Sequence, residues 1–315
     1  MKIITLWVWA FWLAILQHIS SNNPHIEFFA YEKDEYALSY MKENRKNPYF
    51  FTNTILNKNI TFVDDITSIV PTADLIILAI PNQYIQSSII EIKPLLKSWV
   101  CFLNLSKWID NVSLRTVSDT IAYELSNFDY HYAVLSGGMI AQELIDWNEL
   151  WVQIGISNLE IGQSIRSIFE NKNLHIDISG EYKNIELYGA LKNIIALYVW
   201  YLEWQWYGYS TIWYHFCNLL KELPYLLEIL GWTSHTDFSQ YALWWDLIAT
   251  CFGQSRNRYF WNLVGLGKSP EEALQILRWE KKHAEWYETL KWLQSIITEE
   301  GRLINYKKIL NIFFP

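Results

Sequence analysis

Three tryptophans near the start of the chain have the spacing of a dinucleotide-binding turn. Trp7, Trp9 and Trp12 occupy the three glycine positions of a G-x-G-x-x-G pattern, and an acidic residue, Glu32, follows 20 positions after Trp12. In this motif the turn carries a pyrophosphate on the N-terminus of a helix, and the acid binds the ribose hydroxyls. The spacing therefore predicts a dinucleotide site, whereas the residue types contradict it.

The segments around the turn are those that the motif requires. A β-rich run precedes it at residues 2–6, a helix-like run follows at 13–19, and a second strand-like run at 26–31 ends beside the acid. The motif's glycines permit a tight turn, backbone approach to the pyrophosphate and close helix–strand packing, and an indole prevents each. Either the similarity is accidental, or these residues are glycine in the working protein.

The composition favours the second explanation. The chain has 18 Trp and only 12 Gly, which is about 4% glycine, whereas glycine normally makes up about 7% of residues. Some bacterial lineages read the codon UGA as glycine, and a translation table that reads it as tryptophan writes such glycines as Trp. Our hypothesis is that many of these tryptophans arise in this way. The alternative is a genuinely Trp-rich protein.

Length and charge narrow the class of protein. A chain of 315 residues with 51% hydrophobic residues is long enough for one large or two ordinary domains. A net charge of −8 argues against a nucleic-acid-binding surface. The three cysteines, Cys101, Cys217 and Cys251, are widely spaced and form no metal-ligand pair. We expect no metal site, and a reducing compartment, the cytoplasm.

The apolar N-terminus also resembles a signal peptide. Lys2 is followed by apolar residues 3–16, but no small-residue cleavage site follows them. Residues 194–216 are rich in aromatic residues, yet Glu203, Gln205 and His215 interrupt them. We therefore expect no cleaved leader and no stable insertion into a membrane.

The two halves of the chain have different patterns. Apolar runs at 74–80, 100–105 and 131–135 indicate buried parallel strands, and Lys107 and Ser136–Gly137 follow two of them at the edge where ligands bind. From residue 181 we expect helices only, broken at Pro224, at Gly231 and at the turn 265–270, over residues 182–230, 237–250, 258–278 and 281–297. The prediction is a Rossmann-type α/β domain with a parallel-rich sheet at 1–180, an all-α domain at 181–315, and a ligand cleft between them.

The order of the motifs resembles the NAD(P)-dependent glycerol-3-phosphate dehydrogenase family over nearly the whole chain. After the glycine-rich turn, that family has a lysine–glycine pair, Ser-Gly-Pro, Gly-Ala-Leu-Lys-Asn, Gly-Asp-Leu, Ser-Arg-Asn-Arg and Ala-Glu-Gly. The corresponding segments here are Lys107-Trp108, Ser136-Gly137-Gly138, Gly189 to Asn193, Trp245-Asp246-Leu247, Ser255 to Arg258 and Ala284-Glu285-Trp286. At Trp108, Trp245 and Trp286, as in the first turn, tryptophan stands where the family has glycine.

The resemblance implies a reaction and a set of site residues. The family moves a hydride between a nicotinamide and the central carbon of dihydroxyacetone phosphate, and its product serves phospholipid synthesis. By resemblance, Lys192 is the catalytic acid, Lys107 contacts substrate and cofactor, and Asp246 orients Lys192. A lysine suits this task when burial or nearby positive charge lowers its pKa. The other implied substrate contacts are Gly137, Ser255, Arg256 and Asn257. The implied cofactor contacts are residues 7, 9 and 12 of the turn with Ala10, Phe11, Lys107, Ala141, Arg256 and Glu285.

The sequence departs from the family at a few positions. Gly138 stands where the family has proline and Met139 where it has serine, which leaves a side-chain contact to substrate at 139 in doubt. The family's arginine near the adenosine ribose falls on Tyr31, and Glu32 beside it favours NAD because a carboxylate repels a 2′-phosphate. Lys33 keeps NADP open as a cofactor. We expect a homodimer that acts on a small phosphorylated substrate.

Three further functions stay open from the sequence alone. One is a related dehydrogenase that acts on another hydroxy acid. A second is a catalytically inactive binding or structural protein, which is what genuine tryptophans in the turn would produce. A third is an aromatic-rich secreted or membrane-surface module.

Overall fold

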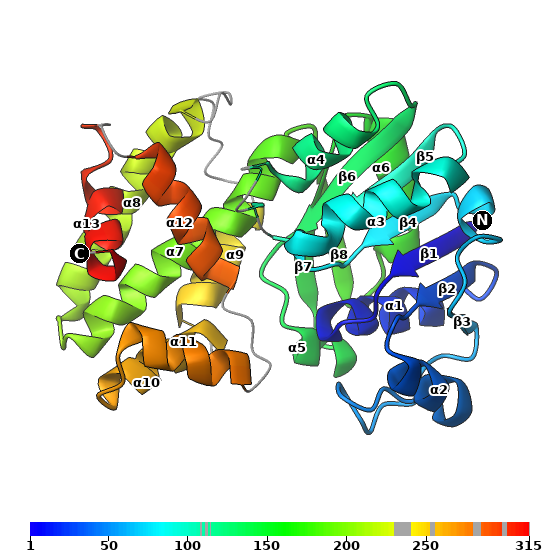
Figure 1. Ribbon diagram of the computed structural model, residues 1–315, viewed down its shortest axis with the longest axis horizontal. Helices are drawn as coiled ribbons and strands as arrows, with labels where there is room; N and C mark the ends of the chain where they lie inside the picture. Colours follow the sequence, from blue (N-terminus) through cyan, green and yellow to red (C-terminus); the bar gives the residue numbers. More distant parts are fainter. Residues whose placement is uncertain are drawn as a thin grey trace.

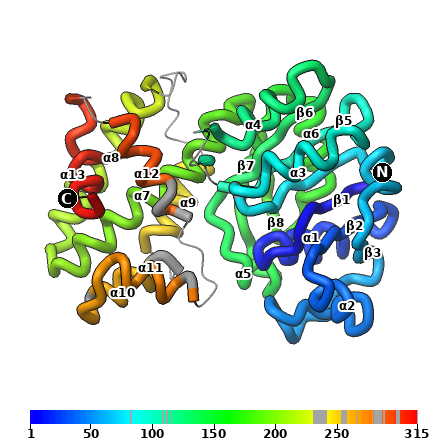
Figure 2. The backbone as a smooth tube through the Cα atoms, viewed as in Figure 1, coloured from blue at the N-terminus to red at the C-terminus, as the bar shows by residue number. Residues whose placement is uncertain are grey.

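The structure is a computed structural model of the 315-residue chain. It describes residues 1–107, 109–110, 113, 115–229, 241–252, 256–279, 285–297 and 301–314. Within these ranges the chain forms a sheet with flanking helices and then a group of helices, which lie side by side with the two termini at opposite ends (Figures 1 and 2). This arrangement confirms the predicted fold class.

Eight strands form one sheet in the order β3-β2-β1-β4-β5-β6-β7-β8. All neighbouring strands are parallel except β6 and β7, which are antiparallel. Their bounds are β1 Lys2–Leu6, β2 Glu27–Tyr31, β3 Ile60–Val63, β4 Leu75–Leu78, β5 Val100–Asn104, β6 Tyr130–Ser136, β7 Leu150–Ile156 and β8 Leu174–Ser179. Because the chain order reverses between β1 and β4, a crevice for a ligand is expected beyond the carboxyl ends of these two strands.

Helices cover both faces of this sheet (Figure 1). Their bounds are α1 Ala10–Asn22, α2 Glu35–Asn44, α3 Ile85–Ile92, α4 Val117–Glu124, α5 Ala141–Ile145 and α6 Leu159–Phe169, with short 3-10 turns η1 Val70–Thr72, η2 Asn82–Tyr84 and η3 Lys93–Leu95. Buried residues of α1, α2, α5 and α6 share one apolar cluster with the sheet, and those of α3 and α4 share another. The strands are buried on both faces, which accounts for their nearly continuous apolar runs.

The second half is helical, as predicted, with different breaks. Its helices are α7 Tyr182–Trp204, α8 Tyr209–Ile229, α9 Tyr241–Phe252, α10 Arg256–Gly265, α11 Pro270–Trp279, α12 Glu285–Ile296 and α13 Ile304–Phe313. The chain passes from β8 to α7 across residues 180–181, which is where we place the proposed division between two domains.

Two details of the helix prediction are wrong. The expected single run over 182–230 is two helices, because the chain turns between Gln205 and Gly208. Pro224 does not break α8, which continues through it. Buried leucines on both sides, such as Leu223 and Leu226, keep that helix packed in the core despite the lost hydrogen bond. Gly231, the other expected break in this region, lies outside the described residues.

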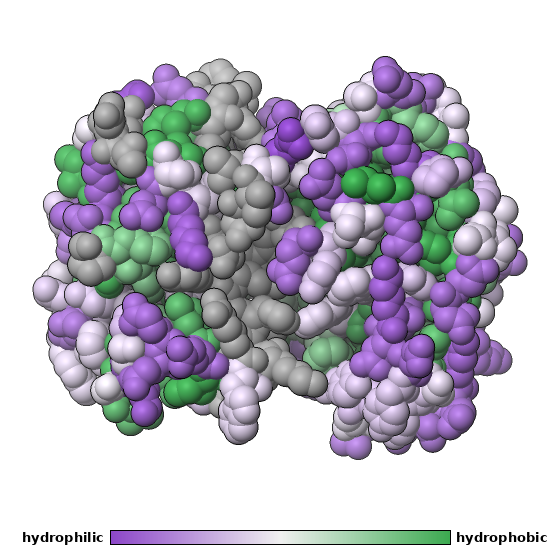
Figure 3. Space-filling model, in the orientation of Figure 1, coloured by the Kyte–Doolittle hydropathy of each residue, from purple (hydrophilic) through white to green (hydrophobic). Residues whose placement is uncertain are grey.

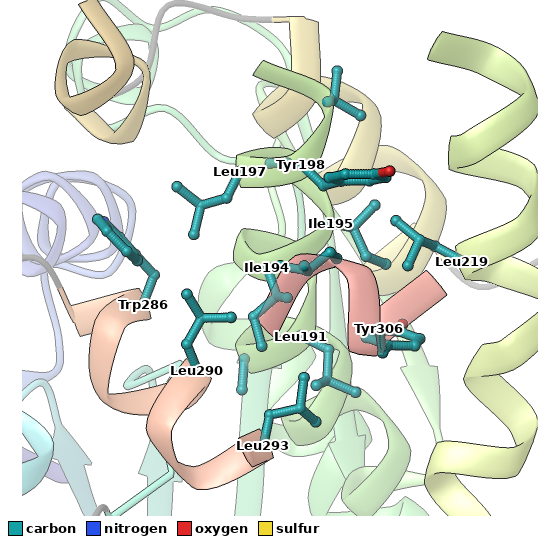
Figure 4. Packing of buried hydrophobic residues seen from close by; sticks show 14 of the residues in the cluster. Leu191, Ile194, Ile195, Leu197, Tyr198, Leu219, Trp286, Leu290, Leu293 and Tyr306 are labelled. Carbon is teal, nitrogen blue, oxygen red and sulfur yellow. The ribbon is translucent and has the colours of Figure 1, made fainter. Parts of the chain in front are cut away.

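Helix α7 is the centre of the helical half. Most of its residues are buried, and it packs against α8, α9, α10 and α12. Figure 4 shows Leu191, Ile194 and Ile195 of α7 among Leu290 of α12 and Tyr306 of α13. A helix that is apolar on all sides is a core helix, so the charged residues within α7 call for an explanation.

The outer surface is mixed in character. In the view of Figure 3, hydrophilic side chains spread over both halves, with hydrophobic ones in small groups between them. Among the described helices, none combines the length and the apolar character that a membrane span requires.

Candidate active site

Three charged side chains from three elements meet where the sheet adjoins the helical half. Lys107 follows β5, Lys192 lies in α7 and Asp246 lies in α9. Lys107 Nζ donates to Asp246 Oδ2 at 2.8 Å and to the carbonyl oxygen of Gly137 at 3.1 Å. Lys192 Nζ donates to the other carboxylate oxygen, Asp246 Oδ1. Residues predicted as catalytic from distant parts of the sequence are thus gathered around one carboxylate.

Burial sets the electrostatics of this cluster. Lys192 is 7% exposed and Asp246 is 2% exposed. Burial lowers the pKa of Lys192 to about 7, Asp246 opposes this change, and Lys107 adds to it. Burial acts to raise the pKa of Asp246, but Lys107 and Lys192 outweigh it and hold that pKa below the usual value. Lys192 can therefore give and take a proton near neutral pH while Asp246 stays ionised.

The loop after β5 is shaped by its own side chains. Asn104 Oδ1 accepts from the backbone N–H of Ser106 at 2.8 Å, and Asn104 Nδ2 donates to the carbonyl of Ser106 at 3.0 Å. The Ser106 hydroxyl donates to the carbonyl of Ile80 at 2.7 Å. These bonds fix the backbone immediately before Lys107. Helix α7 passes close by at Gly189, where a Cβ would make van der Waals contact with Lys107 Cγ at 3.4 Å.

The loop after β6 brings backbone groups to the same place. Gly137 has φ +151°, and a Cβ on it would lie 3.0 Å from the carbonyl oxygen of Trp151. A Cβ on Gly138 would lie 2.3 Å from Trp245 Cδ1, so the indole before Asp246 covers this loop. The Ser136 hydroxyl is buried and has no hydrogen-bond partner within the described part of the chain. The backbone of the Ser136-Gly137-Gly138 segment thus comes within hydrogen-bond distance of Lys107.

The predicted dinucleotide turn joins β1 to α1, as its spacing requires. Trp7 has φ +72° and donates its N–H to the carbonyl of Tyr31 at 2.8 Å. The Val8 N–H donates to Glu32 Oε2 at 3.2 Å, so the acid after β2 meets the turn. Helix α1 begins at Ala10 without a side-chain cap and without an acidic residue in its first turn. The free N–H groups of such a helix start favour an anion.

The indoles of the turn do not fit a pyrophosphate. The Trp7 ring lies 5.0 Å from the ring of Tyr84, which belongs to the loop after β4. The Trp9 ring lies 6.3 Å from that of Phe50. Trp12 is 1% exposed, and its Nε1 has no partner among the residues that the structure describes. Trp7 and Tyr84 come from the two sides of the β1/β4 crevice and meet across it.

Of the other residues predicted to contact substrate or cofactor, some have described side chains and others do not. Ala10 and Phe11 begin α1, Ala141 begins α5, and these two helices pack against each other beside the turn. Ser255 lies outside the described residues, as do Trp108 and Ala284. Arg256, Asn257 and Glu285 lie in α10 and α12, but their side chains are outside the description.

Sequence reasoning missed a buried polar group next to this cluster. Glu186 of α7, Tyr132 of β6, Ser118 of α4 and Asn104 of β5 form one hydrogen-bonded network. A charged residue in the helix core was the available signal, since a buried carboxylate needs hydrogen-bond partners. Within the described part of the chain, no three His, Cys, Asp or Glu residues form a group that could hold a metal ion.

Two family models cover most of the chain. Residues 8–160 match the NAD-dependent glycerol-3-phosphate dehydrogenase N-terminus, and residues 181–312 match the C-terminus of the same family. A glycerol-3-phosphate dehydrogenase (NAD(P)+) of Fusobacterium nucleatum is 30% identical over 268 residues, which are 85% of this chain and 78% of that protein. The chain belongs to this family. The resemblance found in its motifs is confirmed.

Other relatives agree with this assignment. A glycerol-3-phosphate dehydrogenase (NAD(P)+) of Clostridium perfringens is 26% identical over 81% of this chain and 76% of its own length. The solved glycerol-3-phosphate dehydrogenase of Plasmodium falciparum has a TM-score of 0.88 at 20% identity, covering 100% of this chain and 91% of that one. That of Coxiella burnetii has a TM-score of 0.83 at 19% identity, covering 99% and 95%. At such identities, the solved structures show a common fold.

Proposed function

We propose that this chain interconverts dihydroxyacetone phosphate and sn-glycerol 3-phosphate with NAD(P)H, in the cytoplasm, and supplies glycerol 3-phosphate for phospholipid synthesis. The observation that carries the proposal is the buried Lys192, with a pKa of about 7, bound to Asp246 beside Lys107. Reduction of a ketone needs a proton donor and positive charge at the developing alkoxide. This cluster supplies both.

Each residue of the cluster has a distinct role in this proposal. Lys192 gives its proton to the carbonyl oxygen during reduction and takes it back during oxidation. Lys107 stabilises the negative charge that develops on that oxygen, and Asp246 holds both ammonium groups in place. The nicotinamide supplies the hydride when it is bound. Burial keeps water from the cluster, which strengthens each of these electrostatic interactions.

The substrate phosphate is assigned to a different segment. We place it at Ser255, Arg256 and Asn257, whose hydroxyl, guanidinium and amide suit a phosphate dianion. Helix α10 begins at Arg256, and a helix start favours an anion. The backbone of Gly137 completes the proposed substrate contacts.

The cofactor is assigned to the β1–α1 turn. Its pyrophosphate would rest on the first N–H groups of α1, near Ala10 and Phe11, with Ala141, Arg256 and Glu285 as further contacts. Glu32 would bind the adenosine ribose, which favours NAD. Burial raises the pKa of Glu32, whereas hydrogen bonds from Asp34, Val8 and Lys33 N–H groups oppose this change.

Cofactor binding at this turn requires glycine, and at residue 7 the backbone supports that identity. Among the described residues, six other than glycine have a left-handed backbone, and four of these are tryptophan: Trp7, Trp99, Trp147 and Trp206. Tryptophan is only about 6% of the chain, from 18 of 315 residues. The left-handed region favours glycine because a side chain there clashes with the backbone. We infer that residues 7, 9 and 12 are glycine in the working enzyme.

The ends of α7 and α5 independently support the hypothesis that tryptophan stands in place of glycine, and the end of α10 provides the comparison. At the end of α7, the N–H of Trp206 donates to the carbonyl of Glu203 and that of Tyr207 to Leu202, which is a Schellman motif with Trp206 at its left-handed position. Residues 147 and 148 repeat this pattern after α5, and residues 267 and 268 repeat it after α10. At the end of α10 the left-handed residue is Gly267, the type that this motif usually has.

The test compares two recombinant chains. One has the sequence as given, and the other carries Trp7→Gly, Trp9→Gly and Trp12→Gly. We expect the glycine form to bind NADH at least ~100-fold more tightly in a fluorescence titration, since indoles no longer cover the helix start. It should also oxidise NADH only when dihydroxyacetone phosphate is present.

Each other outcome favours a different function. Turnover of a hydroxy acid without phosphate, in place of dihydroxyacetone phosphate, would indicate a related dehydrogenase. Tight NADH binding by the chain with all 18 tryptophans would contradict the glycine assignment. Absence of NADH binding by both chains would favour an inactive binding or structural protein.

We also propose a homodimer. Its support is the group of exposed aromatic residues at the start of α8 and just before it, Tyr207, Tyr209, Trp213 and Tyr214, because large exposed apolar groups mark interaction sites. Light scattering after size-exclusion chromatography should give twice the mass of the chain, and a monomer mass at micromolar concentration would contradict the proposal.

A further inference from the structure

Glu186 is a buried carboxylate that the proposed reaction does not use. It is the fifth residue of α7 and is 3% exposed. Its Oε1 accepts from Tyr132 OH at 2.7 Å, from the Ser118 N–H at 3.1 Å and from Asn104 Nδ2 at 3.3 Å. Its Oε2 accepts from the Ser118 hydroxyl at 2.6 Å. Four donors from three elements of the sheet domain thus converge on one side chain of α7.

These partners lead directly to Lys107. Asn104 is the last residue of β5, and the same amide group that donates to Glu186 also donates to the carbonyl of Ser106. Asn104 therefore couples the carboxylate to the backbone that precedes Lys107. Tyr132 lies in β6, the strand that ends at Ser136, directly before Gly137. Glu186 is bonded to both strands whose ends build the cluster.

The same helix continues from Glu186 to Lys192. Gly189 follows one turn later, and a Cβ on it would lie 3.4 Å from both Lys107 Cγ and Ser136 Oγ. Lys192 follows after a further turn and binds Asp246. Glu186 and Lys192 lie less than two turns apart on one helix, so a shift of Glu186 against β5 and β6 would also move Lys192 relative to Lys107.

We propose that Glu186 is a positioning residue that sets the separation of Lys107 and Lys192 across Asp246. Packing alone does not require a carboxylate here, since an apolar residue would fill the space without the penalty of burying a charge. Four directed hydrogen bonds fix the orientation of α7 in a way that apolar contacts do not. The proposal rests on the roles proposed for the two lysines.

A second buried glutamate provides a matched control. Glu222 of α8 is 8% exposed and accepts from the N–H and side-chain amide of Asn305 and from the N–H of Tyr306. These partners belong to the first turn of α13. Glu222 thus resembles Glu186 in burial and in the number of bonds, but it bonds a helix end that carries none of the proposed catalytic residues.

The experiment uses the chain with glycine at positions 7, 9 and 12 and also at 108, 245 and 286, where the family has glycine. Glu186→Ala should lower kcat for dihydroxyacetone phosphate reduction about 10- to 100-fold, because small misplacements of reacting groups have effects of this size. The KM for NADH should change less than about threefold by the same argument. Glu186→Gln keeps an acceptor for Tyr132 and Asn104 and should restore most of kcat. Glu222→Ala should lower the melting temperature while kcat per folded enzyme stays unchanged.

A second measurement does not depend on turnover. Hydrogen exchange of intact protein should show faster exchange at amides 105–107 and 136–137 in Glu186→Ala, but not in Glu222→Ala. If both alanine variants lose stability alike, keep kcat and leave these amides protected, Glu186 is structural only and the proposal is wrong. If the parent chain has no turnover, the proposed function fails, while the exchange pattern still decides whether Glu186 positions Lys107.

Discussion

The carboxyl ends of β1 and β5 lie at one edge of the same sheet, yet the loops that follow them carry different kinds of side chain. After β5, the Asn104 side chain forms hydrogen bonds with the backbone of Ser106, and the following residue, Lys107, binds Asp246. After β1, Trp7 is held in a left-handed backbone and its ring meets Tyr84. One loop is organised for chemistry, and the other is covered by indoles.

The two loops depend on different things. The chemistry after β5 needs side chains that are present, whereas the turn after β1 needs side chains to be absent. Replacement of glycine by tryptophan would block the second kind of site. It would leave the charged groups of the first in place, although the Trp245 ring lies against Gly138. The same replacement would account for Trp147 and Trp206 at left-handed helix ends.

The largest loss of activity should come from replacing Lys192, the proposed acid in helix α7. In the chain with glycine at 7, 9 and 12, Lys192→Met should lower kcat by about 10²- to 10⁴-fold, the usual contribution of a general acid. NADH binding should stay unchanged, because Lys192 lies in the cluster and not in the turn. Lys183→Met, which changes an exposed lysine of the same helix, is the control. A Lys192→Met enzyme that keeps more than half of kcat would contradict the assigned role.

The pH dependence of the reaction should follow Lys192. Ketone reduction needs its ammonium form, so kcat should fall with rising pH above about 7, by about tenfold per unit. Oxidation needs the neutral amine and should fall below that pH. Asp246→Asn should move both limbs to lower pH, because the carboxylate raises the pKa of Lys192 against the effect of burial. If the pH profiles of kcat do not shift in this variant, Lys192 is not the titrating group.

The smallest expected effect is a change in stability at two helix ends, those of α7 and α10, which have the same hydrogen-bond pattern. Trp206 is 93% exposed and Gly267 has open space where a Cβ would stand, so backbone strain decides both substitutions. Trp206→Gly should raise the free energy of unfolding by about 1 kcal/mol, and Gly267→Trp should lower it by about as much. Urea unfolding measures both. A lower stability of Trp206→Gly would show that this tryptophan belongs there.

The sequence predicted those parts of the fold that follow from apolar patterns. Apolar runs alone were enough to predict the strands at 74–80, 100–105 and 131–135. The position of Lys107 after β5 followed from the second of these runs. The turn at 205–208 was missed because the left-handed residue at this helix end is Trp206 and not glycine, the usual stop signal. Pro224 misled the prediction because burial of the neighbouring leucines outweighs one lost hydrogen bond.

The candidate site was predictable only in part. Lys107, Lys192 and Asp246 were found through their motifs, but the pKa of Lys192 depends on burial that only the folded chain provides. Glu186 was missed because its four donors come from residues 104, 118 and 132, and no local spacing connects them. Networks of this kind follow from the sheet order, which patterns along the sequence do not determine.

The most direct test of the glycine assignment is the mass of the peptide that spans residues 3–33 in protein from its native cell. Glycine at positions 7, 9 and 12 should make the peptide lighter than the given sequence requires, by the difference between three tryptophans and three glycines. Fragment masses should place the change at those residues. A peptide with three tryptophans would contradict the account and would mean that the chain keeps the dehydrogenase fold without a working nucleotide turn.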